Sequence, residues 1–181
     1  MILGLGIDIL DRSRLARLLL VKKARPSQHQ PQRSIRTRLA ERILSGRERD
    51  SVEWQAVLEK DAASGSDGAT PSTELVSYLA NRWTAKEAAY KALYPGYQPS
   101  WKELSLLKGV ASQPKKPVLL FHPSSSPSSG SRSDPYQLHP HITLLVSIAH
   151  DGPFTVASVI ANSSSSSSAS TEHDNTRISS S

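Results

Sequence analysis

Hydrophobic and polar positions alternate at the start of the chain, which predicts a β-strand. Between residues 3 and 9, leucine or isoleucine alternates with Gly4, Gly6 and Asp8. This two-residue period gives one apolar face and one nearly bare face that ends in a carboxylate. Because a backbone without side chains can be approached closely, we expect a ligand or another chain to contact the glycine face.

The following segment has the pattern of an amphipathic helix. Asp11 is a suitable N-cap for a helix over residues 12–23, in which a leucine stripe lies beside Arg14, Arg17 and Lys22. Two interpretations remain open. The stripe could belong to the core with a solvated charged face, or the basic face could dock a partner.

Helical patterns continue through the middle of the chain. One resumes near Ile35, and Ser45 with Glu48 has the spacing of a capping box that opens another helix through residues 52–58. Thr70, followed by Pro71, is the expected start of the longest helix, which Pro95 and Gly96 end.

The C-terminal half contains short runs typical of strands. They cover residues 104–107, 118–121, 142–148 and 154–160, and Asp151-Gly152 between the last two indicates a hairpin turn. Together these elements predict an α+β fold in which a small antiparallel sheet packs against a long helix.

Composition shifts set the domain limits. The expected domain spans residues 1–162. Segments rich in Ser, Pro or Gln, or in small residues, predict insertions in it at about 24–34, 62–70 and 123–135. Residues 163–181 are almost all polar, so a disordered Ser-rich tail is expected. No apolar run approaches the ~20 residues that cross a bilayer, and no targeting segment can be read, so we expect a soluble protein without membrane partners.

Composition also limits the chemistry. The chain has no cysteine, so a metal site must use oxygen or imidazole ligands. The formal charge of +6 and the pI near 9.7 favour an acidic partner. Nucleic acid, a phosphorylated cofactor and an acidic protein all fit this charge.

The residues most suited to chemistry lie in the longest predicted helix. Lys86, Glu87, Tyr90 and Lys91 are separated by small alanines, a pattern that suits a metal-bound phosphate better than a core. Glu87 and Lys91 could also form a simple helix-stabilising pair. Asp8 would add a second oxygen ligand, and Mg²⁺ often binds only one or two carboxylates besides phosphate and water.

His150, at the end of a predicted strand, has two interpretations. Its imidazole could be a structural hydrogen-bond donor, or it could contact a phosphate or adenine group.

These motifs, in this order, resemble those of the 4′-phosphopantetheinyl transferases of the holo-acyl-carrier-protein synthase type. The resemblance rests on Gly-Ile-Asp at residues 6–8, the run Leu-Ala-Glu-Arg-Ile-Leu-Ser at 39–45, the helix at 82–92 and Val-Ser-Ile-Ala-His at 146–150. It implies Mg²⁺ ligands at Asp8 and Glu87, with Lys91 stabilising charge on the leaving group. It also implies a coenzyme A site lined by Arg82, Lys86, Lys91 and His150, and a carrier-protein contact at Arg14.

The resemblance implies transfer of the 4′-phosphopantetheine group from coenzyme A to a serine of an apo acyl carrier protein, releasing adenosine 3′,5′-bisphosphate. It further implies a homotrimer with active sites between chains. The insertions suggest a fungal stand-alone enzyme, and similar enzymes serve a mitochondrial carrier protein; a cytoplasmic location is the alternative. A basic nucleic-acid-binding module and a non-enzymatic carrier-binding subunit are the rival hypotheses, neither of which needs the two acids.

Overall fold

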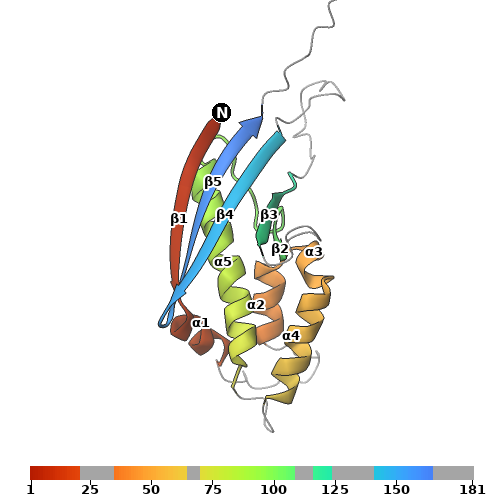
Figure 1. Cartoon of the computed structure of the whole chain (residues 1–181). Coiled ribbons are helices and arrows are strands. Elements are labelled where there is room, and N and C mark those ends of the chain that lie inside the picture. The colour runs from red at the N-terminus through yellow and green to blue at the C-terminus, as the bar shows by residue number, and fades with distance from the viewer. Residues whose placement is uncertain (21–34, 65–69, 109–115, 124–140, 165–181) are drawn as a thin grey trace, which may run out of the picture.

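A five-stranded antiparallel sheet and a long helix organise the protein (Figure 1). The computed structural model describes residues 1–20, 35–64, 70–108, 116–123 and 141–164. The strands, in the spatial order β1-β5-β4-β3-β2, are β1 (Ile2–Asp11), β2 (Leu104–Lys108), β3 (Pro117–Phe121), β4 (His141–Asp151) and β5 (Phe154–Ser164). The helices are α1 (Arg12–Leu19), α2 (Ile35–Ile43), α3 (Gly46–Arg49), α4 (Val52–Ala63) and α5 (Thr73–Leu93). The predicted α+β class is confirmed.

Helix α5 packs directly on β1 at the two glycines. A Cβ atom on Gly4 would collide with the backbone carbonyl of Ala92, and one on Gly6 would collide with that of Ala88. The expectation that a ligand or another chain meets this glycine face is therefore wrong, because the chain's own helix covers it. The opposite face of β1 carries large apolar side chains and is exposed.

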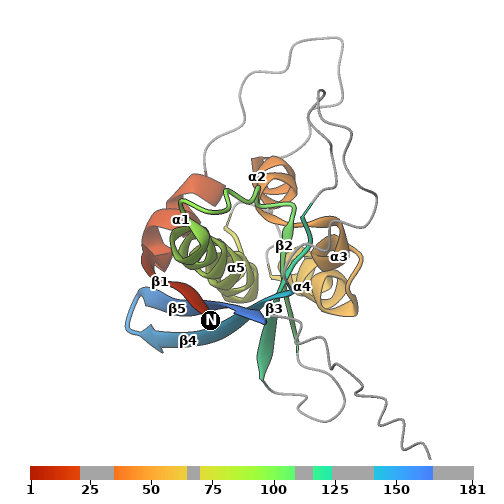
Figure 2. The ribbon, with the colours of Figure 1, turned by 90° about the horizontal axis from the view of Figure 1, so that it is seen from above.

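The two halves of α5 lie in different parts of the core. Its first half packs among α1, α2 and α4. Leu75 and Leu79 in this half are fully or almost fully buried. Its second half presents Ala85, Ala88 and Ala92 to the sheet. Figure 2 shows α5 between the long strands and the other helices. Small side chains let the second half approach the strands closely, which brings its polar residues next to β1.

Local signals determine where the helices begin. Ser45 and Glu48 form the predicted capping box, but it opens only the four-residue α3. The predicted helix over residues 52–58 belongs to α4, which Ser51 caps. The predicted cap at Thr70 is wrong: the Ser72 hydroxyl accepts from the Leu75 amide at 3.1 Å, and the Ser72 amide donates to Asp61 Oδ1 at 2.7 Å. The Ser72 side chain therefore caps α5, and the first turn starts at Thr73.

The β4–β5 hairpin confirms the predicted turn, with Asp151 opposite Phe154 and Gly152 at a φ of +50°. The hairpin is longer than predicted, because the Ser163 amide donates to the Met1 carbonyl at 2.8 Å and extends β5 past Asn162. β5 ends at Ser164, two residues past the predicted domain end at residue 162, which stays a prediction.

The predicted insertion at 24–34, most of the one at 123–135 and residues 165–181 of the tail lie outside the described residues. Part of the predicted insertion at 62–70 is helical, since α4 continues to Ala63. Within the described residues, no helix is long and apolar enough to span a bilayer.

Replacement of Gly6 by alanine tests the contact between α5 and β1. The new methyl group would overlap the Ala88 carbonyl, so we expect Gly6→Ala to lower the melting temperature, with a cost of at least the ~1–3 kcal/mol typical of overpacking. Gly46→Ala is the matched control, because a Cβ there has open space. Equal melting temperatures for the two variants would contradict the contact.

Candidate active site

Asp8 and Lys91 form an ion pair between β1 and α5. Lys91 Nζ donates to Asp8 Oδ1 and to the Ile7 carbonyl, both at 2.9 Å. The Asp8 side chain is 18% exposed and that of Lys91 is 50% exposed. An ammonium has three N–H donors, and these two contacts use two of them. Lys91 can therefore also donate to a group that enters from solvent.

Glu87 lies one helical turn before Lys91, beside the same ion pair. Burial and the nearby negative charge of Asp8 raise its pKa, whereas Lys91 and a hydrogen bond from the Trp101 side chain oppose the shift. The two carboxylates are thus close enough to repel each other. No group of three or more His, Cys, Asp or Glu side chains able to hold a metal occurs in the described part of the chain. Two acids remain a suitable donor set for Mg²⁺, whose other ligands are commonly waters and phosphate oxygens.

Lys86 points away from this pair and into the interior. Its fully buried ammonium donates to Glu48 Oε2 at 2.6 Å, to the Ile43 carbonyl at 2.7 Å and to the Trp101 carbonyl at 2.9 Å. Burial lowers its pKa to about 8, although Glu48 opposes the shift. All three N–H donors are used within the chain. The role of Lys86 at a coenzyme A site stays a prediction.

Arg82 is also internal. Its guanidinium lies 3.2 Å from the centre of the Tyr78 ring and pairs with Glu48 at 3.6 Å and Glu53 at 3.4 Å. Burial lowers its pKa. With a residue exposure of 5%, Arg82 is buried in the core, and its role at a coenzyme A site stays a prediction.

Glu48 has more contacts than the sequence motifs predicted, because they identified it only as part of a helix cap. Its completely buried carboxylate accepts from the amides of Ser45 at 2.7 Å and Leu106 at 2.8 Å, in addition to Lys86. The Ser-x-x-Glu spacing identified the first contact. The contacts to α5 and β2 join residues 38 and 58 positions apart, and no local pattern reports them.

His150 lies apart from the acids within one chain. Its Nδ1 is 3.2 Å from the hydroxyl of Thr155, across the hairpin. Thr155 in turn pairs with Leu10 of β1, so β5 separates His150 from the strand that carries Asp8. Two strand spacings amount to about 10 Å. The structure therefore groups Asp8, Glu87 and Lys91 but leaves His150 on another strand.

Helix α1 displays the predicted basic face. Arg14 and Arg17 are exposed, whereas Leu15 and Leu19 are buried. A small hollow beside the helix is lined by Leu10, Arg14, Leu15, Leu18 and Trp83. The stripe therefore belongs to the core while the basic face stays free, so the two interpretations of this helix are compatible.

Arg12, at the start of α1, holds the helix against its neighbours. Its guanidinium donates to the carbonyls of Gly152 and Pro153 in the hairpin turn and to the Ser77 hydroxyl of α5. These contacts fix α1 to both the hairpin and the long helix.

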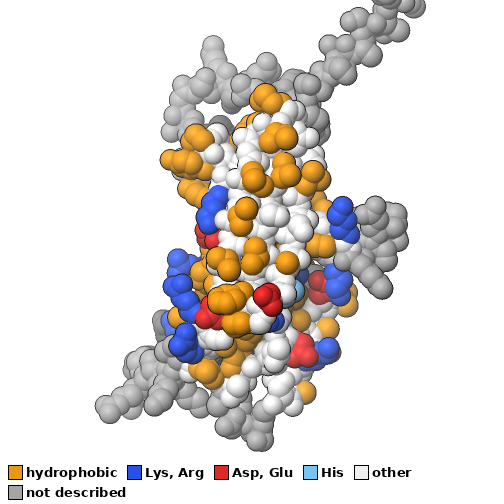
Figure 3. Space-filling model, turned by 60° about the vertical axis from the view of Figure 1, so that its left-hand side comes forward, with side chains coloured by type: hydrophobic (Ala, Val, Ile, Leu, Met, Phe, Trp, Pro, Cys, Tyr) orange, Lys and Arg blue, Asp and Glu red, His pale blue; other side chains and the backbone are white. Residues whose placement is uncertain are grey.

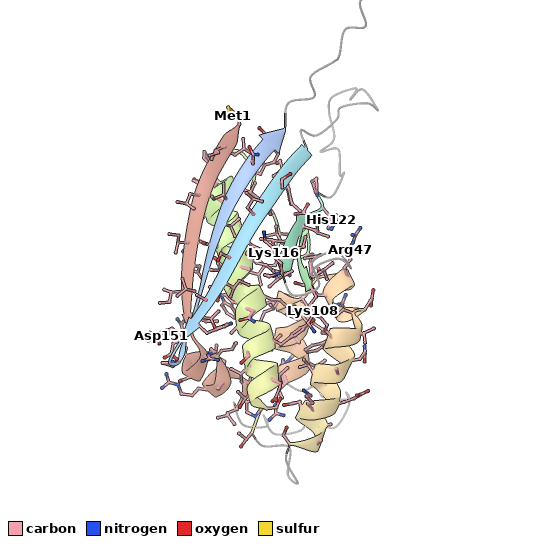
Figure 4. The ribbon with its side chains drawn as sticks, viewed as in Figure 1. Met1, Arg47, Lys108, Lys116, His122 and Asp151 are labelled. Atoms are coloured by element: carbon pink, nitrogen blue, oxygen red, sulfur yellow. The ribbon has the colours of Figure 1, made fainter. Side chains whose placement is uncertain are left out.

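A second basic region surrounds β2 and β3. Figure 4 labels Arg47, Lys108, Lys116 and His122 on this side of the molecule. Burial and the charge of Arg47 lower the pKa of His122. Because β1 and β2 form opposite edges of the sheet, this region is distant from Asp8. Positive charge alone therefore does not locate the site.

Comparison with known proteins identifies the family of this chain. A sequence profile described as the 4′-phosphopantetheinyl transferase superfamily matches residues 4–139. The chain belongs to this superfamily. A comparison with curated protein sequences found no match.

Solved structures of the superfamily share the fold. A holo-(acyl-carrier-protein) synthase from Bacillus anthracis, in complex with coenzyme A (3′,5′-ADP), is 22% identical with a TM-score of 0.55, and the match covers 91% of this chain and 99% of that one. The enzyme from Neisseria meningitidis is 22% identical, with a TM-score of 0.51 and coverage of 90% and 99%. The one from Plasmodium yoelii is 16% identical, with a TM-score of 0.53 and coverage of 91% and 98%.

A double-mutant cycle tests the buried charge pair of this transferase-family chain. Lys86→Met should cost about 3–5 kcal/mol in urea denaturation, because it leaves the Glu48 carboxylate buried without its ammonium partner. Glu48→Gln should also destabilise, and the double variant should lose clearly less than the sum. Lys60→Met, on the exposed side of α4, serves as the control. Costs that add within about 0.5 kcal/mol would contradict the coupling.

Proposed function

We propose that this protein transfers the 4′-phosphopantetheine group of coenzyme A to a serine of an apo acyl carrier protein, with Mg²⁺ as cofactor. The observation that carries the proposal is the junction of Asp8, Glu87 and Lys91, built from β1 and α5 of a chain in the transferase superfamily. The products are the holo carrier protein and adenosine 3′,5′-bisphosphate.

The two carboxylates fit a divalent cation. Glu87 is partly buried, and its pKa is raised in part by Asp8, so a cation between them would relieve their repulsion. A Mg²⁺ ion held there would neutralise part of the charge on the pyrophosphate of coenzyme A. Two rival functions, a nucleic-acid-binding module and a non-enzymatic carrier-binding subunit, do not require two acids beside one lysine.

Lys91 has the geometry to act on the leaving group. In the reaction the serine oxygen bonds to the attacked phosphorus, the bond from phosphorus to the bridging oxygen breaks, and the serine proton passes to a water or a carboxylate. Asp8 and the Ile7 carbonyl orient the Lys91 ammonium and leave one N–H for a phosphate oxygen. Charge that develops on the departing bisphosphate is thereby stabilised.

Helix α1 is the proposed docking face for the carrier. Arg14 and Arg17 are exposed beside the partly exposed Leu18, which gives an acidic partner both ionic and apolar contacts. We further propose a mitochondrial carrier protein of a fungal cell, on the basis of the insertions and of the resemblance noted above.

A homotrimer with sites between chains is supported by the outer face of the sheet. The exposed apolar side chains of this face are Ile2, Leu5, Ile7 and Ile9 of β1, Leu145 of β4 and Ile160 of β5. Figure 3 shows hydrophobic side chains along this face, with basic side chains at its margin. Large exposed apolar side chains that gather on one face are typical of protein contacts. A neighbouring copy could bring its His150 to the site that Asp8 begins.

Removal of either acid tests the central proposal. With coenzyme A, Mg²⁺ and apo carrier proteins, the unaltered protein should add the mass of one phosphopantetheine group to a carrier. Asp8→Asn and Glu87→Gln should each lower turnover at least ~100-fold, because each removes a charged oxygen ligand of the cation. Glu74→Gln, on the exposed first turn of α5, should be neutral. Unchanged carrier mass across several carriers would overturn the proposal.

Charge reversal at Arg14 tests the docking face. Arg14→Glu should raise the KM for the carrier about tenfold and leave that for coenzyme A nearly unchanged, because only the carrier meets α1. Arg49→Glu, on α3, is the control with the same change of charge. Equal increases in both KM values would place docking elsewhere.

Mixing of subunits tests the shared site. If Asp8 and His150 from different chains complete one site, refolded mixtures of Asp8→Asn and His150→Ala should be more active than either variant alone. Light scattering should give the mass of three chains. A monomer at working concentration would refute the trimer.

A further inference from the structure

Lys91 holds a fixed positive charge against one of the two proposed metal ligands. Its ammonium donates to Asp8 Oδ1 and to the Ile7 carbonyl, both at 2.9 Å. That carbonyl belongs to the backbone of β1, which lies against α5 with no room for a side chain at Gly4 or Gly6. The ammonium is therefore bonded to the strand as well as to the carboxylate. A cation that approaches Asp8 meets a positive charge whose position the fold sets.

Glu87 lies on the same side of α5 as this ammonium. It precedes Lys91 by four residues, a spacing that puts both side chains on one face of the helix. The junction thus has two negative groups and one positive group, so its net charge is negative. A divalent cation that binds alone reverses that sign and adds to the positive charge of the ammonium. A pyrophosphate group that arrives with the cation brings the negative charge that offsets this excess.

The two positive charges would lie close together. Mg²⁺ binds carboxylate oxygens at roughly 2.0–2.1 Å, so an ion on either oxygen of Asp8 would lie within about 7 Å of the Lys91 ammonium. Both side chains are partly exposed, so water and salt weaken this repulsion without removing it. Free metal ion and ammonium therefore oppose each other at Asp8.

We propose that Lys91 makes the site select a divalent cation in complex with pyrophosphate over the free ion. This inference rests on the proposed function, in which Asp8 and Glu87 bind the cation. The ammonium opposes an ion that arrives alone. Its remaining N–H donates to a phosphate oxygen when the ion arrives with coenzyme A. Lys91 thus determines which species binds, in addition to its proposed action on the leaving group.

The first experiment measures Mn²⁺ binding without coenzyme A, by electron paramagnetic resonance at low ionic strength. Lys91→Met keeps an unbranched side chain but removes the charge, so it should bind Mn²⁺ about tenfold more tightly than the unaltered protein does. Lys91→Arg keeps a positive charge and should bind Mn²⁺ as weakly as the unaltered protein. Lys60→Met removes the same charge at an exposed position of α4 and should have no effect. An affinity of Lys91→Met no higher than that of the unaltered protein would overturn the inference.

A second measurement needs only the unaltered protein. Its Mn²⁺ affinity is compared with and without coenzyme A, after correction for the Mn²⁺ that coenzyme A binds in solution. Coenzyme A should tighten Mn²⁺ binding at least ~tenfold, and by linkage Mn²⁺ should tighten coenzyme A binding by the same factor. Pantetheine, which has no phosphate, should leave the Mn²⁺ affinity unchanged. Equal Mn²⁺ affinity with and without coenzyme A would refute the selection, whether or not a lysine variant folds.

The outcomes separate this inference from the function on which it rests. If the unaltered protein binds no Mn²⁺ with coenzyme A and modifies no carrier, the proposed function is overturned, and the selection by Lys91 falls with it. If the unaltered protein binds Mn²⁺ and transfers the group, but Lys91→Met binds free Mn²⁺ no more tightly, the function stands and only the selection is refuted.

Discussion

The close contact between α5 and the glycines of β1 is the constraint on which the rest of the structure depends. Any side chain at Gly4 or Gly6 would collide with a helix carbonyl, so helix and strand can meet only as backbone against backbone. That separation brings Lys91 within 2.9 Å of Asp8 and of the Ile7 carbonyl. A wider spacing would separate Asp8 on β1 from Lys91 and Glu87 on α5. The geometry of the candidate site thus follows from the absence of side chains at two positions.

Lys86 and Lys91, both in α5, have opposite surroundings. Lys91 is half exposed and keeps an N–H free, whereas Lys86 is fully buried with three acceptors. The cost of burying Lys86 is offset by Glu48 and two carbonyls, which together join α2, α3, α5 and the loop at Trp101. A lysine in a motif that resembles a phosphate site can therefore belong to the core. The same carboxylate also pairs with Arg82, so one buried acid neutralises two residues that sequence motifs assign to a ligand.

Sequence patterns predicted the elements better than the contacts between them. Alternation in β1, the capping box at Ser45 and the turn at Gly152 are local, and each occurs as expected. The grouping of Asp8 with Glu87 also followed from the motifs. By contrast, which face of β1 is covered depends on α5, which lies far later in the chain, and alternation gives two faces without saying which is inside. The burial of Arg82 and Lys86 likewise depends on Glu48, which is distant in sequence.

Arg12 fixes the position of the proposed docking helix, α1. Because its guanidinium bonds to the hairpin turn and to Ser77, α1 is anchored at its first turn to two elements that also frame Asp8. A partner that binds such a helix need not order it first, so little conformational entropy is lost in the encounter. If α1 docks the carrier as proposed, the distance from the docked surface to Asp8 and Glu87 is set before binding. In that arrangement the position at which the carrier docks determines how far its serine lies from the two acids.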